Sequence, residues 1–246
     1  MENPPVRYVR LTVNFQLSAE IQNWHLAKFL SEVAASYSDR QEVAPRPTAD
    51  REEVEITVSD SLNWPIPRTV LSRSGKSLEV QADQLSVIWS FDGSTESKYP
   101  GFEDLLSDIT GKWLLLTRSL GELDFQVQLK EVECHYGNEI NGFSRGELLV
   151  GVLTNWQVEP SNDSKLELED YAGIRFQSRE SSEHPFTSTV MVDAPRGSAP
   201  LLGFEVSKKV NNQEITGELR SVHDRVIENF LRYVSEKMLK RWGRQS

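Results

Sequence analysis

Cysteine is almost absent from this chain. Cys134 is the only one, so an internal disulfide cannot form and a metal site built from several thiolates is excluded. Long apolar runs are missing too: runs such as the three leucines at 114–116 fall far short of the roughly 20 residues of a membrane-spanning helix. Residues 1–5 show no basic region followed by an apolar core, which predicts no secretory signal. Together these absences predict a cytoplasmic protein that does not enter a membrane.

Motifs for catalysis and for cofactors are scarce as well. The sequence has no glycine-rich phosphate-binding motif and no H-E-x-x-H, and His25, His135 and His184 share no ligand spacing. We therefore expect no metal and no cofactor. Residues 142–146 match G-x-S-x-G, but a nucleophile elbow needs a helix after the serine, and residues 147–152 have the pattern of a strand. The motif is better explained as a loop between strands, and no catalytic residue is predicted.

Charge is unevenly distributed along the chain. There are 37 acidic and 27 basic residues, a formal net charge of -10, which argues against general attraction to nucleic acid or anionic lipid. Residues 219–246 differ, because seven Lys/Arg stand there against three acids, a net of +4. Cations near the end of a helix complement its dipole, so a structural interpretation is favoured. If the basic residues Arg232, Lys240 and Arg241 bind a partner, an acidic protein surface is favoured over a phosphate backbone.

Hydrophobic periodicity predicts an α+β fold. Apolar residues alternate with polar ones over residues 9–17, which indicates a strand, and a helix capped by Ser18 follows with apolar positions three or four apart. A hairpin with its turn at Ser74–Gly75 and one long second arm over 77–91 is predicted next. The remaining predicted elements are a helix over 101–119, a strand over 125–140, strands over 148–158, 166–177, 186–192 and 201–209, and a basic amphipathic helix over 222–242 that begins at a Ser221-x-x-Asp224 cap.

This order predicts mostly antiparallel sheet packed with three main helices. Turns rich in Ser, Asn, Asp, Gly and Pro separate the later strands, as in an antiparallel meander. We divide the chain into an N-terminal α+β half, residues 1–140, and a C-terminal half, residues 141–246, made of the meander and the basic helix. Each half ends a sheet next to a helix, so two similar halves are conceivable.

Several blocks of the sequence occur together in one known family. They are the strand over 78–89, the Tyr-Pro-x-aromatic-Glu motif at 99–103, the His223-Asp224 pair and the later Trp242-Gly243. With them the chain resembles an uncharacterised, sporadically distributed prokaryotic family of about this length. It departs from the family at residues 138–140, where Asn-Glu-Ile replaces Asn-Arg-Ile. The resemblance implies no reaction, but a patchy distribution is typical of accessory genes in phage defence, toxin–antitoxin modules or mobile elements.

These observations favour a non-enzymatic module that binds another protein or a second copy of itself. An accessory role in a bacterial defence or toxin–antitoxin system is the most specific form of this hypothesis. Besides the three basic residues named above, Tyr99 and Glu103 at the entry of the 101–119 helix are candidate binding residues. Two alternatives stay open: an enzyme acting on nucleic acid or nucleotides with carboxylates from distant strands, and nucleic-acid binding through the C-terminal basic helix.

Overall fold

The computed structural model describes residues 6–46, 67–93, 98–140, 173–179, 186–193, 200–210 and 214–242. The chain separates into two compact units. The N-terminal unit is Arg10–Glu133 with Lys209–Arg220, and the C-terminal unit is Met1–Val9, Cys134–Lys208 and Ser221–Ser246. The sequence-based boundary at residue 140 stays a prediction.

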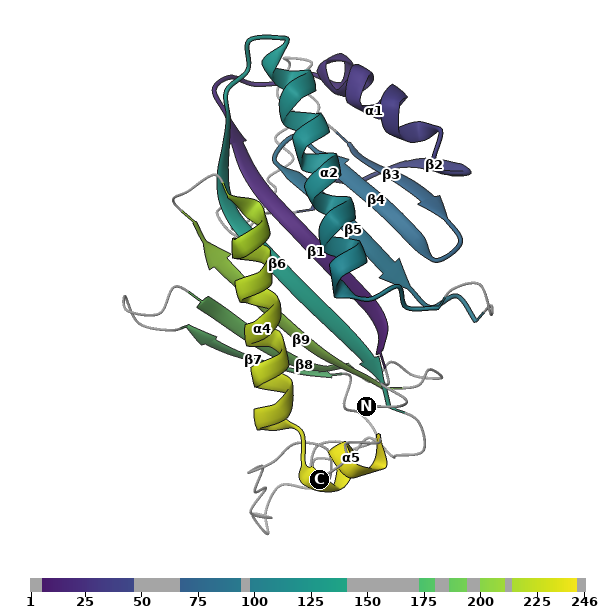
Figure 1. Cartoon of the computed structure of the whole chain (residues 1–246), viewed down its shortest axis with the longest axis vertical. Coiled ribbons are helices and arrows are strands. Elements are labelled where there is room, and N and C mark those ends of the chain that lie inside the picture. The colour runs from purple at the N-terminus through teal and green to yellow at the C-terminus, as the bar shows by residue number, and fades with distance from the viewer. Residues whose placement is uncertain are drawn as a thin grey trace. The chain divides into compact units, whose positions relative to one another are not determined.

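The strands form a nine-stranded antiparallel sheet in the order β2-β3-β4-β5-β1-β6-β9-β8-β7 (Figure 1). With the helices described below, this confirms the predicted α+β class. The strands are β1 (Val6–Leu17), β2 (Asp39–Val43), β3 (Arg68–Arg73), β4 (Lys76–Gln81), β5 (Gln84–Ser90), β6 (Val127–Glu139), β7 (Gly173–Arg179), β8 (Phe186–Asp193) and β9 (Leu201–Lys209).

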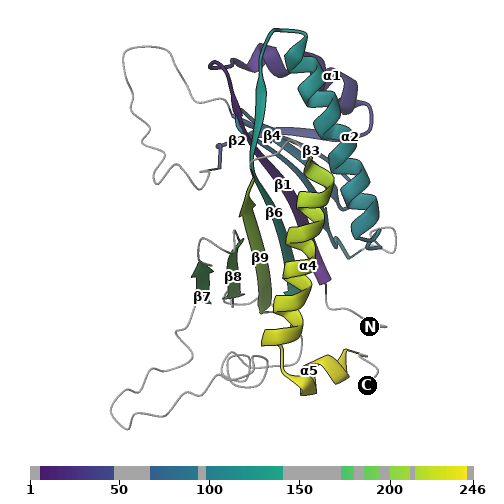
Figure 2. The ribbon, with the colours of Figure 1, turned by 60° about the vertical axis from the view of Figure 1, so that its left-hand side comes forward.

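Helices cover one face of the sheet within the N-terminal unit (Figures 1 and 2). They are the 3-10 helix η1 (Asn23–Leu26), α1 (Ala27–Ala34) and α2 (Phe102–Gly121). The predicted helix over 101–119 is confirmed as α2, which buries Leu105, Ile109 and Leu116 almost completely. Phe15 of β1 meets Trp113 of α2 with ring centroids 5.5 Å apart. The apolar side chains that alternate along β1 therefore pack against the apolar face of α2, and the core lies between the strand and the helix.

Two sequence-based details of this unit are wrong. Residues 77–91 are not one arm but the two strands β4 and β5, which pair with each other from Lys76↔Trp89 to Gln81↔Gln84. The buried residues Leu78 and Val80 are even-numbered and Leu85 and Val87 odd-numbered, a change of phase that marks the two-residue turn between them. The predicted turn at 74–75 is correct: Ser74 and Gly75 both have positive φ, 42° and 73°.

Ser18 does not cap a helix. Its hydroxyl accepts a hydrogen bond from the Gln126 backbone N–H at 3.1 Å, and its own N–H donates to the Gln126 carbonyl at 3.0 Å. Helical structure begins five residues later, at Asn23. A long-range backbone pairing has therefore taken the place of the local cap that the sequence suggests.

In the C-terminal unit, β7, β8 and β9 are successive antiparallel neighbours, so these strands form the predicted meander. Helix α4 (Ile215–Tyr233) covers one side of them (Figure 2). Phe204 of β9 meets Phe230 of α4 edge-on at 5.5 Å, and Asn229 donates to the Ser188 hydroxyl at 2.9 Å. The strand predicted over 148–158 and the 142–146 motif lie outside the described residues.

The predicted helix over 222–242 is wrong in both its start and its continuity. Helix α4 begins at Ile215, where the Glu214 carboxylate accepts the N–H groups of Thr216 and Gly217 at 2.9 and 2.7 Å. The Ser221-x-x-Asp224 pattern therefore lies inside the helix and caps nothing. The helix ends at Tyr233, and α5 (Glu236–Arg241) follows after Ser235, whose backbone is extended. None of the described helices is long and apolar enough to cross a membrane.

Candidate functional site: a polar sheet face and an exposed tryptophan

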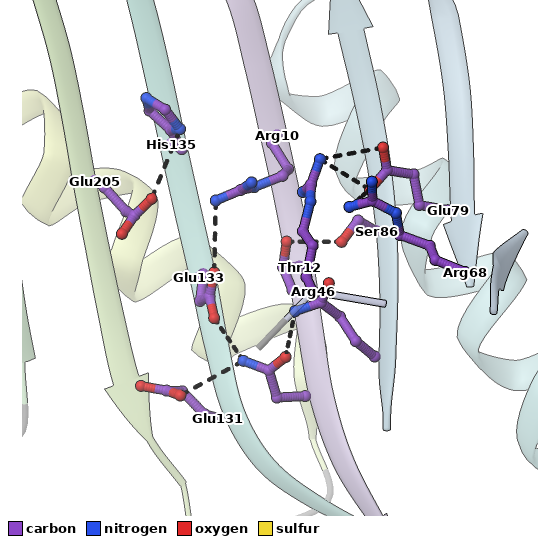
Figure 3. A network of polar contacts seen from close by, with 12 residues as sticks. Arg10, Thr12, Arg46, Arg68, Glu79, Ser86, Glu131, Glu133, His135 and Glu205 are labelled. Atoms are coloured by element: carbon purple, nitrogen blue, oxygen red, sulfur yellow. Dashed lines mark hydrogen bonds and ion pairs between the residues drawn. The ribbon is translucent and has the colours of Figure 1, made fainter. Parts of the chain in front are cut away.

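The second face of the sheet is polar in the N-terminal unit, although much of it is buried. Along β1, Leu11 and Val13 face the helices, and Thr12 and Asn14 point the other way, only 1% and 5% exposed. Because successive strand residues alternate between faces, the neighbouring strands add further polar side chains on the same side (Figure 3). The buried ones among them are Glu79, Gln81, Gln84, Ser86 and Glu131.

Asn14 is the centre of this polar face. Its amide nitrogen donates to Glu133 Oε1 at 2.5 Å and to Glu131 Oε2 at 3.4 Å, and its amide oxygen accepts from Gln84 Nε2 at 2.9 Å (Figure 3). Arg10 Nη2 lies 3.8 Å from Glu133 Oε2. One amide thus joins two carboxylates of β6 to β5, and Arg10 supplies positive charge close to one of them.

A second cluster surrounds Glu79 of β4. Arg46 Nη2 lies 3.1 Å and Arg68 Nη1 3.4 Å from Glu79 Oε2. Gln81 holds the Arg46 backbone in place, because its side chain accepts from the Arg46 N–H at 2.9 Å and donates to the Arg46 carbonyl at 3.0 Å. In the two clusters the three arginines Arg10, Arg46 and Arg68 balance the formal charge of the three glutamates.

The C-terminal unit has a smaller histidine–carboxylate pair. His135 Nδ1 of β6 lies 3.7 Å from Glu205 Oε2 of β9, and Arg175 Nη2 lies 3.8 Å from the other oxygen. The Tyr8 ring meets His135 edge-on at 5.3 Å. A Cβ at Gly203 would lie 3.1 Å from His135 Nε2. A larger residue at this position would therefore crowd the imidazole, and glycine avoids that contact.

These groups limit the chemistry that the polar face can support. Within the described parts of the chain, no group of three or more His, Cys, Asp or Glu side chains is placed to hold a metal ion. Glu79, Glu131 and Glu133 each have a hydrogen bond or ion pair inside the network. Such mutual satisfaction offsets the cost of burying polar groups. Glu131 and Glu133, which both reach the Asn14 amide, are close enough together to act on a ligand.

The predicted binding residues Tyr99 and Glu103 both contact their own chain. Tyr99 is half-buried, with its ring centroid 5.0 Å from that of Trp89. Glu103 forms a two-pronged ion pair with Arg220 of α4, with Nη2 to Oε2 at 2.8 Å. The same guanidinium lies over the Phe102 ring, 5.9 Å from its centroid. Glu103 therefore joins the start of α2 to the start of α4 within the N-terminal unit.

The predicted basic residues are divided between two helices. Arg232 lies on α4, with its guanidinium 5.5 Å from the Tyr233 ring, and Lys240 is exposed on α5. Arg241 is the last residue of α5, and its side chain lies outside the described part. The His223–Asp224 pair lies in mid-α4, with Nδ1 and Oδ1 3.1 Å apart. The basic residues therefore do not form one continuous helical stripe.

An exposed tryptophan was not among the predicted site residues. Trp24 on η1 is 60% exposed, yet it has two contacts with its own chain. Its indole Nε1 donates to Gln22 Oε1 at 2.7 Å, and its ring lies against His25, tilted by 40°, with 3.6 Å between centroids. His25 in turn accepts the Gln22 N–H through Nδ1 at 2.8 Å and packs edge-on against Phe125 at 4.8 Å. The indole thus contacts neighbouring side chains while much of it faces solvent.

The segment after α2 completes this region, which we call the Trp24 surface: Gln22, Trp24, His25 and Phe125. Leu123 is 40% exposed. Beside it, Glu122 pairs with Lys28 of α1. The hydrogen bond from Lys28, together with the charges of Lys28 and Arg118, lowers the pKa of Glu122, so this carboxylate stays ionised at neutral pH.

A sequence signal for Trp24 existed. The buried positions of this region, Leu26, Phe29, Leu30 and Val33, follow helical spacing. Trp24 lies outside that stripe. A large aromatic residue that is not on the buried face of a helix can indicate an interaction site. What the sequence does not reveal is that Phe125, about a hundred residues away, supports the indole through His25.

No protein-family model and no curated protein matches this chain.

Proposed function

We propose that this chain is a non-enzymatic protein-interaction module and that the Trp24 surface is its contact. The observation that carries the proposal is an indole that is 60% exposed and yet has a hydrogen bond to Gln22 and a close ring contact with His25. The family resemblance extends the proposal to an accessory component of a bacterial defence or toxin–antitoxin system. That extension rests on the resemblance alone.

The energetics of binding favour this surface. Tryptophan is enriched among the few residues that dominate interface energies, where truncation costs about 2 kcal/mol or more. Ordering a loose side chain on binding costs roughly 0.5–1.5 kcal/mol. Because the Trp24 side chain already contacts Gln22 and His25 in the free chain, binding a partner should require less further ordering of this side chain.

Other exposed apolar side chains lack this support. Leu114 on α2 is 63% exposed, but isolated exposed leucines are ordinary on protein surfaces. Ile227 and Leu231 lie one turn apart on α4, each 39% exposed, and Asp224 and Glu228 accompany them on that helix. At Trp24, by contrast, an exposed aromatic ring contacts a second ring, His25, which itself packs against Phe125.

Affinity capture from lysate of the native host, quantified by mass spectrometry and repeated with purified candidates, tests the proposal. Trp24→Ala should weaken capture of a specific partner by at least about 30-fold, the equivalent of 2 kcal/mol. Leu114→Ala is the matched control, since it removes an equally exposed apolar side chain elsewhere in the same unit and should leave capture unchanged. A protein that stays monomeric and captures nothing, or a Trp24→Ala variant that binds as wild type does, would refute the proposal.

A second candidate function is an enzyme acting on nucleic acid or nucleotides. The observation that favours it is that Glu131 and Glu133 both reach the Asn14 amide, so two carboxylates lie close together beside Arg10. Turnover of a panel of nucleotides and oligonucleotides by the wild-type chain, lost in Glu133→Gln, would support it. Absence of turnover in the wild-type chain would leave the interaction module as the better account.

A further inference from the structure

We infer that the Trp24 surface recognises a basic side chain, so that its partner presents an arginine, or less well a lysine, to the exposed indole. This inference rests on the proposed function and specifies its partner. It follows from the charges around the indole and from an arrangement found elsewhere in the chain.

The surroundings of Trp24 are acidic. Residues 18–28 and 120–126 are held together by the hydrogen bonds between Ser18 and Gln126 and by the contact of His25 with Phe125. These two segments carry three carboxylates, Glu20, Glu122 and Asp124, and one lysine, Lys28. Because Lys28 pairs with Glu122, the charge left over is that of Glu20 and Asp124, both of which are exposed.

An aromatic ring beside excess negative charge favours a cation. The Trp24 indole contacts His25 at a tilt of 40°, and the exposed part of the ring offers an electron-rich π-surface. Guanidinium suits this environment better than ammonium, because it is planar and more weakly hydrated. An acidic partner segment would meet like charge, which is costly at an interface.

The chain already contains such a combination. Arg220 lies over the Phe102 ring while its guanidinium forms two bonds to the Glu103 carboxylate. At the Trp24 surface the ring and the carboxylates are present, and the arginine would come from the partner.

Small amides of single amino acids test the inference directly. The probes are N-acetyl-arginine amide, N-acetyl-leucine amide and N-acetyl-glutamate amide. Titration is followed by the indole N–H resonance of Trp24, identified among six tryptophans by its disappearance in Trp24→Phe. We expect a saturable shift with the arginine amide that weakens as salt is added, a much smaller shift with the leucine amide, and none with the glutamate amide.

Asp124→Asn is the matched variant. Asp124 has a φ of 63°, a conformation that asparagine tolerates as well as aspartate does, so the variant removes charge without straining the backbone. Combined with Glu20→Gln, it should weaken binding of the arginine amide several-fold and leave the leucine amide unaffected.

The outcomes separate this inference from the proposed function. An equal shift with the leucine amide, no saturable shift with the arginine amide, or unchanged arginine binding in the double variant would each overturn basic recognition. Loss of partner capture in Trp24→Ala would still support the interaction module in all three cases. Lost capture together with a selective arginine response supports both.

Discussion

At the scale of single residues, two glycines of α2 should respond in opposite directions to the same substitution. Gly101 precedes the helix with φ 102° and ψ 159°, a region that is essentially closed to other residues. No atom lies within 4 Å of a Cβ placed there, so the cost of Gly101→Ala is conformational. We expect a loss of about 1–3 kcal/mol in the free energy of unfolding, measured by denaturant titration.

Gly111 supplies the control. It lies in the middle of α2, is exposed, and has open space where a Cβ would stand. Gly111→Ala should stabilise the protein by about 0.4–1 kcal/mol, because alanine has less conformational entropy to lose in a helix. If both variants change stability in the same direction, the backbone explanation for Gly101 fails.

Tyr37 should make stability sensitive to alkaline pH. Burial raises the pKa of Tyr37 well above its ordinary value, and the charge of Asp108 raises it further. Above about pH 10 the unfolded chain releases this proton and the folded chain retains it. The stability that is fully present below that pH is therefore lost as pH rises toward the folded-state pKa.

Denaturant titrations between neutral pH and about pH 11 measure this effect, the upper limit lying just above the ordinary tyrosine pKa. Tyr37→Phe should show a shallower decline over the alkaline part of the range than the wild-type chain. An identical decline in both proteins would mean that other groups control alkaline unfolding.

At the scale of elements, the polar sheet face is held by cross-strand pairs. Thr12 of β1 and Ser86 of β5 are 1% and 0% exposed, and their hydroxyl oxygens are 2.9 Å apart. Thr12→Val leaves the Ser86 hydroxyl buried without this partner, which should cost about 1–3 kcal/mol. Adding Ser86→Ala removes both polar groups and should recover much of the loss.

A double-mutant cycle with the two single variants and the double variant measures the coupling free energy. A favourable coupling of about 0.5 kcal/mol or more is expected for groups in contact. Additive effects would show that the two hydroxyls do not stabilise each other.

At the scale of the whole molecule, the negative net charge should prevent this protein from binding nucleic acid. The net charge is -10, and the candidate basic residues Arg232, Lys240 and Arg241 lie on two separate helices. Several of the arginines already serve internal contacts, as in Arg220 with Glu103 and Arg225 with Glu228. We expect no binding of labelled duplex DNA or single-stranded RNA by fluorescence anisotropy between about 50 and 200 mM salt.

Charge reversal provides the control for this expectation. If binding is seen, Arg232→Glu, Lys240→Glu and Arg241→Glu together should abolish it and its salt dependence. That result would show that these basic residues bind nucleic acid and not an acidic protein surface.

Local periodicity in the sequence determined much of the secondary structure. The period-two run of β1 and the buried stripe of α2 follow from which side chains are apolar and how they are spaced, and the meander of β7, β8 and β9 follows from the turns between successive strands. These features could be predicted because each depends on neighbours within a few residues. They fix which face of an element is buried, and hence the α+β class.

Only the tertiary structure decided what each face meets. Asn14 reaches Glu131 across 117 positions of sequence, Ser18 pairs with Gln126 where a local helix cap was expected, and the C-terminal helix ends at Tyr233 although its apolar spacing continues. The Trp24 surface is of the same kind, because Phe125 supports the exposed indole through His25. Apolar spacing specifies that a side chain is buried or exposed, whereas its partners depend on strand register and packing between segments distant in sequence.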